Sequence, residues 1–327
     1  MIGRRDFITL MGGAAAWPLA ARAQQAAVPV IGFLSSTALE GLAPYLSAFR
    51  QALHETGLVE GRNVTIEYRW ADNENDRLRA LAGEFVRRQT SVIAAPSIAA
   101  ALAAKSATST IPIVFYTGAD PVSIGLVTSL SRPSGNLTGV TGLGSELEPK
   151  RLELLHELVP TATAFALLVN ATNPVLAEST VKGLQAAART LGLKLHVLNA
   201  STEQEIDAAF ASFALLGAGG LVIGADNFFN SRSEQLARLS TRHAAPVVYQ
   251  YHEFAAAGGV MSYGGSLTDA YRLVGGYVGR ILNGEKPADL PVQRATKVDL
   301  IINLKTAKML DLNIPASLLA RADEVIE

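Results

Sequence analysis

The sequence predicts an α/β protein made of two lobes, each a doubly wound parallel sheet. Short β-branched apolar runs alternate with amphipathic helical segments, which is typical of parallel sheets with right-handed crossovers. This alternation occurs twice, on either side of a turn-rich stretch at residues 131–144. The chain has 327 residues, 49% of them hydrophobic and 17% charged, and this size favours two domains over one.

The first strand is expected at Val28–Leu34, where consecutive apolar residues suit a strand buried on both faces. Ser35 and Ser36 follow it and should lie at the carboxyl end of the sheet, where open α/β sheets bind their ligands. The next helix is expected at Leu42–Glu55, because its apolar residues recur three or four apart, the spacing of one helical face.

The same alternation continues to about residue 141. Further strands are expected at Asn63–Trp70, Ser91–Ala95, Ile111–Tyr116 and Leu137–Val140, and further helices at Asp76–Arg88 and Ile98–Ala107. These elements complete the first lobe. The glycine-rich turns up to residue 144 are the expected crossing between lobes.

The second series begins with a helix at Glu146–Leu158. Its strands are expected at Ala164–Val169, Lys194–Leu198, Gly220–Ile223, Pro246–Tyr249 and Gly259–Ser262, separated by helices at Val175–Leu191, Glu203–Leu216 and Ser231–His243. A helix at Leu267–Leu282 then ends at Asn283 and Gly284, a typical C-terminal stop. A linker bracketed by two prolines leads to a segment at Lys297–Ile302 and a final helical stretch. Periodicity leaves open which lobe this tail joins.

The first 23 residues have the composition of an export signal. Arg4 and Arg5 precede a mildly apolar, glycine- and alanine-rich segment, and Ala21-Arg22-Ala23 supplies a small-x-small cleavage pattern. This resembles a twin-arginine signal, which is removed after export. The alternative is an uncleaved anchor, although the segment is short for a transmembrane helix. The sequence contains no cysteine, so neither disulfides nor a lipid-modified cysteine are expected, and the mature protein should diffuse freely in a periplasm.

Charge and motifs argue against several functional classes. The chain has 28 basic and 29 acidic residues without a long run of one sign, so no nucleic-acid partner is expected. The five histidines show no metal-ligand spacing, and neither a Gly-x-Ser-x-Gly elbow nor a Walker loop is present. The first strand lacks the glycine triplet of a dinucleotide site. We therefore expect no catalytic residues, no metal and no cofactor.

Small polar and aromatic side chains gather at the predicted strand ends. Hydroxyls and helix N-termini can bind a carboxylate, an aspartate can bind an ammonium group, and aromatic rings supply apolar area. The predicted ligand-binding residues are Ser35, Ser36, Ser97, Tyr116, Asp120, Asn170, Asn173, Asp226, Phe228 and Tyr263.

Each of these residues also has a purely structural interpretation. Any one of Ser36, Ser97 and Asn173 could be an ordinary helix N-cap, and Asp120, followed by proline, fits a cap as well as a ligand contact. Asp226 could cap the next helix, and the aromatic residues could belong to the core. The prediction of a cleft rests on the joint pattern.

Several of these motifs together resemble a known family. The export signal, the segments Val30–Ser35 and Asp120–Val122, the stretch Gly135–Val140 (GNLTGV) and the tail Ile301–Ala307 (IINLKTA) are similar to ABC-transporter substrate-binding proteins of the family that includes tryptophan-binding lipoproteins. The resemblance covers essentially the whole mature chain. The absence of a cysteine anchor departs from the lipoprotein members.

The resemblance implies a type I periplasmic binding fold, in which three hinge strands join two lobes that close on a ligand. The expected division gives residues 28–142 plus about 265–290 to the N-terminal lobe and 143–264 plus about 291–327 to the C-terminal lobe. It implies an ABC permease and ATPase at the inner membrane as partners, with the binding protein a monomer. The ligand is expected to be an amino acid or an aromatic or carboxylate-containing metabolite, with its amine on Asp226.

Two other functions stay open at this point. One is an exported α/β enzyme acting on a small metabolite, which would need a carboxylate beside a second ionisable group. The other is a ligand-sensing module that presents its closed state to a membrane receptor, since sensing and transport use the same closing lobes.

Overall fold

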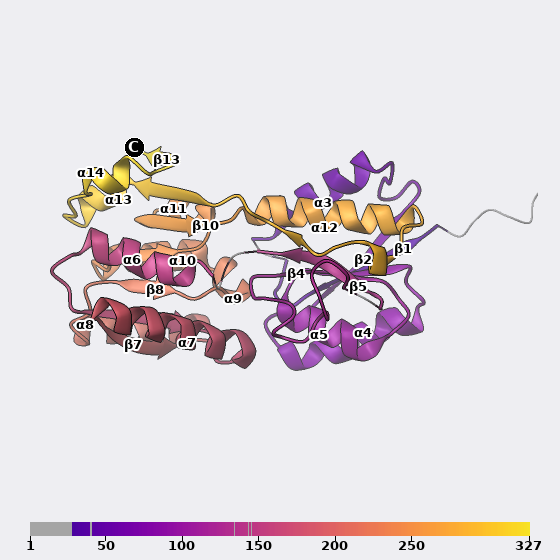
Figure 1. The fold of residues 1–327 in the computed structure, drawn as a ribbon, viewed down its shortest axis with the longest axis horizontal. Coiled ribbons are helices and arrows are strands. Elements are labelled where there is room, and N and C mark those ends of the chain that lie inside the picture. The colour runs from indigo at the N-terminus through magenta and orange to yellow at the C-terminus, as the bar shows by residue number, and fades with distance from the viewer. Residues whose placement is uncertain (1–27, 40, 134, 143, 145) are drawn as a thin grey trace, which may run out of the picture.

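The computed structural model describes residues 28–39, 41–133, 135–142, 144 and 146–327. It shows two α/β lobes side by side along the long axis of the molecule (Figure 1). The predicted export signal and its cleavage site at Ala23 lie outside the described residues. Within the described part of the chain, no helix is both long and apolar enough to cross a membrane.

The first lobe is organised around a parallel sheet with the strand order β11-β5-β4-β3-β1-β2, which comprises six strands among the described residues. The strands are β1 (Val30–Ser35), β2 (Thr65–Trp70), β3 (Val92–Ala95), β4 (Ile113–Thr117), β5 (Leu137–Thr141) and β11 (Gln293–Arg294). The helices are α3 (Ala43–Glu55), η1 (Asn75–Arg77), α4 (Leu78–Arg87), α5 (Ile98–Ala107), α12 (Leu267–Leu282) and η2 (Pro287–Asp289).

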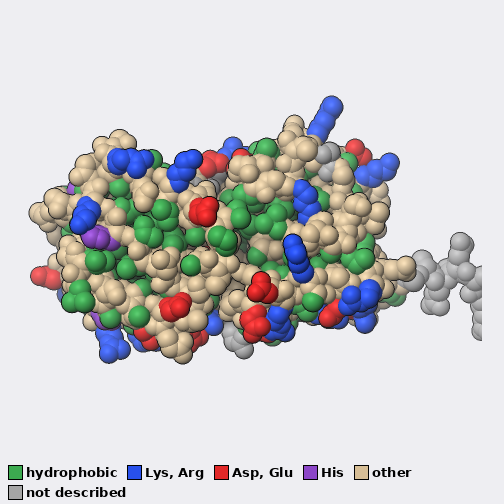
Figure 2. Space-filling model, turned by 90° about the horizontal axis from the view of Figure 1, so that it is seen from below, with side chains coloured by type: hydrophobic (Ala, Val, Ile, Leu, Met, Phe, Trp, Pro, Cys, Tyr) green, Lys and Arg blue, Asp and Glu red, His purple; other side chains and the backbone are tan. Residues whose placement is uncertain are grey.

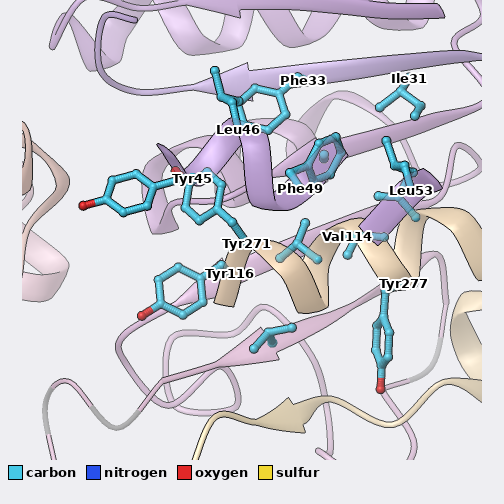
Figure 3. Packing of buried hydrophobic residues seen from close by; sticks show 14 of the residues in the cluster. Ile31, Phe33, Tyr45, Leu46, Phe49, Leu53, Val114, Tyr116, Tyr271 and Tyr277 are labelled. Atoms are coloured by element: carbon cyan, nitrogen blue, oxygen red, sulfur yellow. The ribbon is translucent and has the colours of Figure 1, made fainter. Parts of the chain in front are cut away.

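Both faces of this sheet are buried, which explains the continuous apolar strands in the sequence. Alternate residues of β1, β3 and β4 contact α3 and α12 on one face, and the residues between them contact α4 and α5 on the other. Figure 3 shows the first of these cores, where Phe33 and Phe49 pack edge to face at 5.4 Å between ring centroids.

Helix α12 returns to the first lobe and packs closely on α3. A Cβ atom at Gly275 would lie 2.4 Å from the Phe49 carbonyl oxygen, and one at Gly279 would lie 2.1 Å from Thr56 Oγ1. Because real Cβ atoms do not approach so closely, these two glycines are what allows the helices to meet at this distance.

The second lobe has a sheet in the order β13-β12-β10-β9-β8-β6-β7, seven strands in the described residues, in which only the β10–β12 pair is antiparallel. The strands are β6 (Ala164–Val169), β7 (Lys194–Asn199), β8 (Leu221–Ile223), β9 (Val247–Tyr249), β10 (Met261–Gly264), β12 (Asp299–Asn303) and β13 (Glu324–Ile326). The helices are α6 (Glu148–Leu158), α7 (Pro174–Leu191), α8 (Glu203–Leu215), α9 (Asn227–Asn230), α10 (Ser233–Arg242), α11 (His252–Ala256), α13 (Leu304–Met309) and α14 (Ala316–Leu319).

The described chain passes between the lobes at three places. These are the connection between β5 and α6, residues 265–266 between β10 and α12, and residues 295–298 between β11 and β12. Figure 1 shows α12 beside α3 in the first lobe and β12 with the final helices in the second. The last passage lies beyond the expected position near residue 291, because Gln293 and Arg294 still pair with β5 of the first sheet.

The structure differs from the sequence prediction in three local features. The expected helix over 231–243 is α10, and a short helix that the sequence did not indicate, α9, precedes it with Asp226 as its N-cap. No helix follows Asp120, whose carboxylate holds a turn instead. The tail ends in strand β13, which pairs with β12 and which periodicity had not indicated.

Candidate ligand-binding site

The carboxyl ends of the parallel strands of both sheets face each other across a cleft between the lobes. The cleft encloses about 560 Å³ not filled by atoms, its open mouth included. Its lining is mainly hydroxyl, amide and aromatic: Ser36, Thr37, Asn73, Asn75, Ser97, Ile98, Ala99, Tyr116, Thr117, Gly118, Asn170, Asn173, Leu176, Ala225, Asp226, Asn227, Phe228, Asn230, Gln250 and Tyr251.

The second-lobe wall is built around the carboxylate of Asp226. Its Oδ1 accepts hydrogen bonds from Asn170 Nδ2 and the Phe228 backbone N–H, both at 2.9 Å, and its Oδ2 accepts one from Asn173 Nδ2 at 2.9 Å. Asp226 is only 8% exposed. Burial raises the pKa of this carboxyl, and the three donors oppose that rise. The oxygens keep lone pairs that a cationic group in the cleft can use.

The first-lobe wall is built around the N-terminus of α5. The hydroxyl of Ser97 accepts a hydrogen bond from the Ala100 N–H at 3.2 Å, and the Ser97 carbonyl accepts one from Ala101. The N–H groups of Ile98 and Ala99 have no partner within the helix and lie at the cleft lining. Ser36, which is 7% exposed, also lines this wall. This wall therefore offers neutral donors to an anionic group.

The two walls contact each other directly. Tyr116 and Tyr251 share a hydroxyl hydrogen bond of 2.9 Å. Asn227 Nδ2 donates to the Pro96 carbonyl and Asn75 Nδ2 to the Thr172 carbonyl, each at 3.2 Å. Because these bonds connect different lobes, the structure represents a closed arrangement.

Seven of the ten predicted residues line this cleft. They are Ser36, Ser97, Tyr116, Asn170, Asn173, Asp226 and Phe228. Their structural roles coexist with this position, since Ser97 caps α5 and Asp226 caps α9. Asn173 precedes α7 without capping it, because its amide donates to Asp226 instead.

The other three predicted residues are not among the lining residues. Ser35 is buried at the end of β1, where its hydroxyl accepts a hydrogen bond from the Thr37 N–H. The carboxylate of Asp120 accepts from the N–H groups of Val122 and Ser123 and so stabilises a surface turn. Tyr263 packs against the core of the second lobe, and its carbonyl accepts from Arg151.

Asn73, Asn75 and Asn230 line the cleft but were not identified from the sequence. Asn73 and Asn75 follow β2, so the strand-end argument would have found them had it been extended to that strand. Asn73 has a φ of 67°, which asparagine tolerates better than most residues. Asn230 lies at the end of α9, a helix too short to be read from periodicity, and accepts a hydrogen bond from Gln250 at 3.2 Å.

The model of the family described as "ABC transporter substrate binding protein" matches residues 27–326. The chain belongs to this family. Its members are binding proteins that act outside the cytoplasm, extracellularly or in the periplasm, and they are not enzymes. The expected family, fold class and non-enzymatic character are thereby confirmed.

Three known proteins are similar to the chain in sequence or in fold. It is 29% identical to the tyrosine-binding protein of Clostridioides difficile over 265 residues, 81% of this chain and 75% of that protein. The crystal structure of a conserved domain protein from Vibrio cholerae has a TM-score of 0.83 at 27% identity, covering 91% of this chain and 99% of the other. A Streptococcus pneumoniae ABC domain in complex with L-Trp has a TM-score of 0.79 at 22% identity, with the same coverage.

Proposed function

We propose that this protein binds an amino acid in the cleft and delivers it to an ABC permease and ATPase at the inner membrane. The proposal rests on one observation: one wall of the cleft carries a buried carboxylate, Asp226, and the other wall carries the N-terminus of α5. An amino acid has one cationic and one anionic group on the same carbon. A cleft with one wall suited to each charge fits this class of ligand.

Asp226 supplies the site for the ammonium group. Asn170 and Asn173 hold its two oxygens in a fixed orientation, so a ligand meets a carboxylate that needs little further ordering. The N–H groups of Ile98 and Ala99, with the hydroxyl of Ser36, form the site for the carboxylate. Ser97 acts by holding the first turn of α5.

Apolar side chains from both lobes line the part of the cleft where a ligand side chain would lie. Ile98, Leu176 and Phe228 line the cleft together with the rings of Tyr116 and Tyr251. Aromatic contacts of this kind favour an aromatic ligand over a small polar one. The relatives described as binding tyrosine and containing L-Trp point to the same class. We infer that L-tyrosine and L-tryptophan are the first ligands to test.

Thermal-shift measurements on the mature protein test this function. A ligand at a hundred times its dissociation constant should add about 2.7 kcal/mol to the free energy of unfolding. L-tyrosine or L-tryptophan should raise the melting temperature, whereas tyramine, which lacks the carboxylate, and the deaminated acid should each raise it much less. Equal shifts for the amino acid and both analogues would contradict a site that reads two charges.

Delivery and location complete the proposal. We propose that a twin-arginine signal directs the chain to the periplasm, that cleavage follows Ala23, and that the mature protein acts as a monomer without a lipid anchor. Uptake of the labelled amino acid should be lost when the gene is deleted and restored by the wild-type chain. Restoration by a chain whose Arg4 and Arg5 are both replaced by lysine would contradict the twin-arginine route.

A further inference from the structure

The side chain of Asn227 joins the two charge-binding walls of the cleft. Its Nδ2 donates a hydrogen bond of 3.2 Å to the carbonyl of Pro96 in the other lobe. Asn227 directly follows Asp226 in the chain, and Pro96 directly precedes Ser97, the N-cap of α5. This hydrogen bond therefore connects the loop that carries the proposed ammonium site to the loop that carries the proposed carboxylate site.

A chain of hydrogen bonds in the second lobe fixes the orientation of the Asn227 amide. Because a carbonyl can only accept, the Nδ2 of Asn227 must face Pro96, and its Oδ1 accepts a hydrogen bond from Asn230 Nδ2 at 3.4 Å. The Oδ1 of Asn230 accepts in turn from the Tyr249 hydroxyl and from Gln250 Nε2, the latter at 3.2 Å. Tyr249 and Gln250 are buried. The amide that reaches the first lobe is therefore held from the core of the second.

The hydrogen bonds of Asn75 and Tyr116 also connect the lobes, but at other places. Asn75 Nδ2 donates to the Thr172 carbonyl at 3.2 Å, between the loops that follow β2 and β6. Tyr116 and Tyr251 share a hydroxyl hydrogen bond of 2.9 Å. None of these four residues is a chain neighbour of Asp226 or belongs to the first turn of α5. These bonds stabilise the closed arrangement in general, whereas the Asn227 bond acts on the distance between the two charge sites.

The distance between the two charge sites decides which amino compounds fit. In an α-amino acid the nitrogen and the carboxyl carbon are about 2.5 Å apart, and one more methylene between them adds up to about 1.3 Å. A ligand of that greater length would push the two loops apart. A hydrogen bond of 3.2 Å that lengthens by about 1 Å is lost, so the longer ligand would bind only at the expense of the Asn227 bond.

We propose that Asn227 is a positioning residue that sets the distance between the ammonium site at Asp226 and the carboxylate site at α5. It thereby selects α-amino acids against homologues with one more methylene between the amine and the carboxylate. The inference rests on the proposed function for both charge sites. The two polar atoms of the Asn227 amide are engaged by Pro96 and Asn230, so this residue acts through the walls of the cleft.

The ratio of two affinities tests this role. Calorimetry would measure Kd for L-tyrosine or L-tryptophan and for the β-homologue of the same amino acid, which has one more methylene before the carboxylate. Wild-type protein should prefer the α-amino acid about hundredfold. In Asn227→Ala, Kd of the α-amino acid should rise about tenfold and Kd of the homologue should stay nearly constant, because the homologue has already lost the bond. An equal loss of affinity for both ligands would overturn the proposal.

Asn75→Ala is the matched control for a general effect on closure. It also removes an amide that donates at 3.2 Å to a carbonyl of the other lobe, but away from the two charge sites. Kd should rise about fivefold for the α-amino acid and for the homologue alike, and the preference should stay at its wild-type value. A preference that falls as much in Asn75→Ala as in Asn227→Ala would overturn the particular role of Asn227.

The wild-type measurements distinguish failure of this inference from failure of the proposed function. If wild-type protein binds neither the α-amino acids nor their homologues, the amino-acid function is wrong and the role of Asn227 falls with it. If it binds an α-amino acid and its homologue equally, the function stands and the selection by distance is wrong. If the preference is present in wild type and fully retained in Asn227→Ala, other groups set the distance, and the role of Asn227 is wrong.

Discussion

The two walls of the cleft bind charge in different ways. The second-lobe wall uses a buried carboxylate, Asp226, which three donors orient. The first-lobe wall uses the N-terminus of α5 with the hydroxyl of Ser36. Its lining residues include no acidic or basic side chain, and Tyr116 is the only one with an ionisable group. A buried ion is costly unless it is paired, whereas backbone donors are neutral. The comparison predicts that ligand affinity is concentrated on the second wall and spread over several groups on the first.

The largest effect is expected from removing the charge of the second wall. Asp226→Ala should weaken binding of an amino acid by about 3 kcal/mol, on the order of a hundredfold in Kd, because the ligand ammonium then has no counter-charge. Isothermal titration calorimetry measures this change. A loss within about twofold, below half a kcal/mol, would show that Asp226 is only a cap of α9.

The second prediction concerns stability without ligand. Glu148 has a folded-state pKa of about 7 against an ordinary value of 4.5. A raised pKa means that the folded state binds the proton more tightly, so its contribution is fully present below pH 4.5 and is lost as the pH rises to about 7. The loss is about 3 kcal/mol. Urea unfolding of wild type and Glu148→Gln across this range should show a difference that grows with pH; a constant difference would contradict it.

A smaller effect is expected on the first wall. Ser36→Ala removes one neutral donor among several. The binding free energy should weaken by about 1 kcal/mol, which raises Kd roughly fivefold. Ser106→Ala, at the far end of α5 from the cleft, is the matched control and should leave Kd unchanged. A hundredfold loss of affinity in Ser36→Ala would show that the two walls contribute equally, and would contradict the predicted difference between them.

The contact between the walls gives a prediction of similar size. Tyr116→Phe removes the hydroxyl bond to Tyr251, which connects the two lobes in this closed arrangement. Closure should cost about 1 kcal/mol more, and Kd should rise roughly fivefold. Tyr271→Phe, in the same core cluster, serves as the control. An equal loss in both variants would indicate a packing effect and not a role for the hydroxyl bond.

The sequence predicted the fold well because strands that are buried on both faces appear in the sequence as continuous apolar runs. The apolar run at Val28–Leu34 and the helical spacing of Leu42–Glu55 correspond closely to β1 and α3. Elements of four or five residues, such as α9 and α11, fall below the length that periodicity resolves. The close packing of α12 on α3 depends on Gly275 and Gly279. The role of these glycines can be recognised only once the positions of both helices are known.

The candidate site was predicted where a polar residue directly follows a strand. This argument located Ser36, Asn170 and Asp226 at the cleft, because parallel strands end at the same edge of a sheet. It also selected Asp120, whose carboxylate serves a local turn, since sequence position alone does not separate the two uses. The burial of Glu148 and Arg151 was not predicted, because charged residues in a helix are normally exposed. Arg151 donates to the carbonyls of Gly144 and Tyr263, and a local sequence pattern does not encode contacts with such distant residues.

A double-mutant cycle between protein and ligand tests the central claim, that Asp226 binds the ammonium group, most directly. Calorimetry would measure Kd for L-tyrosine or L-tryptophan and for the same compound without its amino group, in wild type and in Asp226→Asn. The account predicts a coupling energy of about 2 kcal/mol, because each change removes the same interaction. A coupling energy near zero, with both changes additive, would contradict the claim.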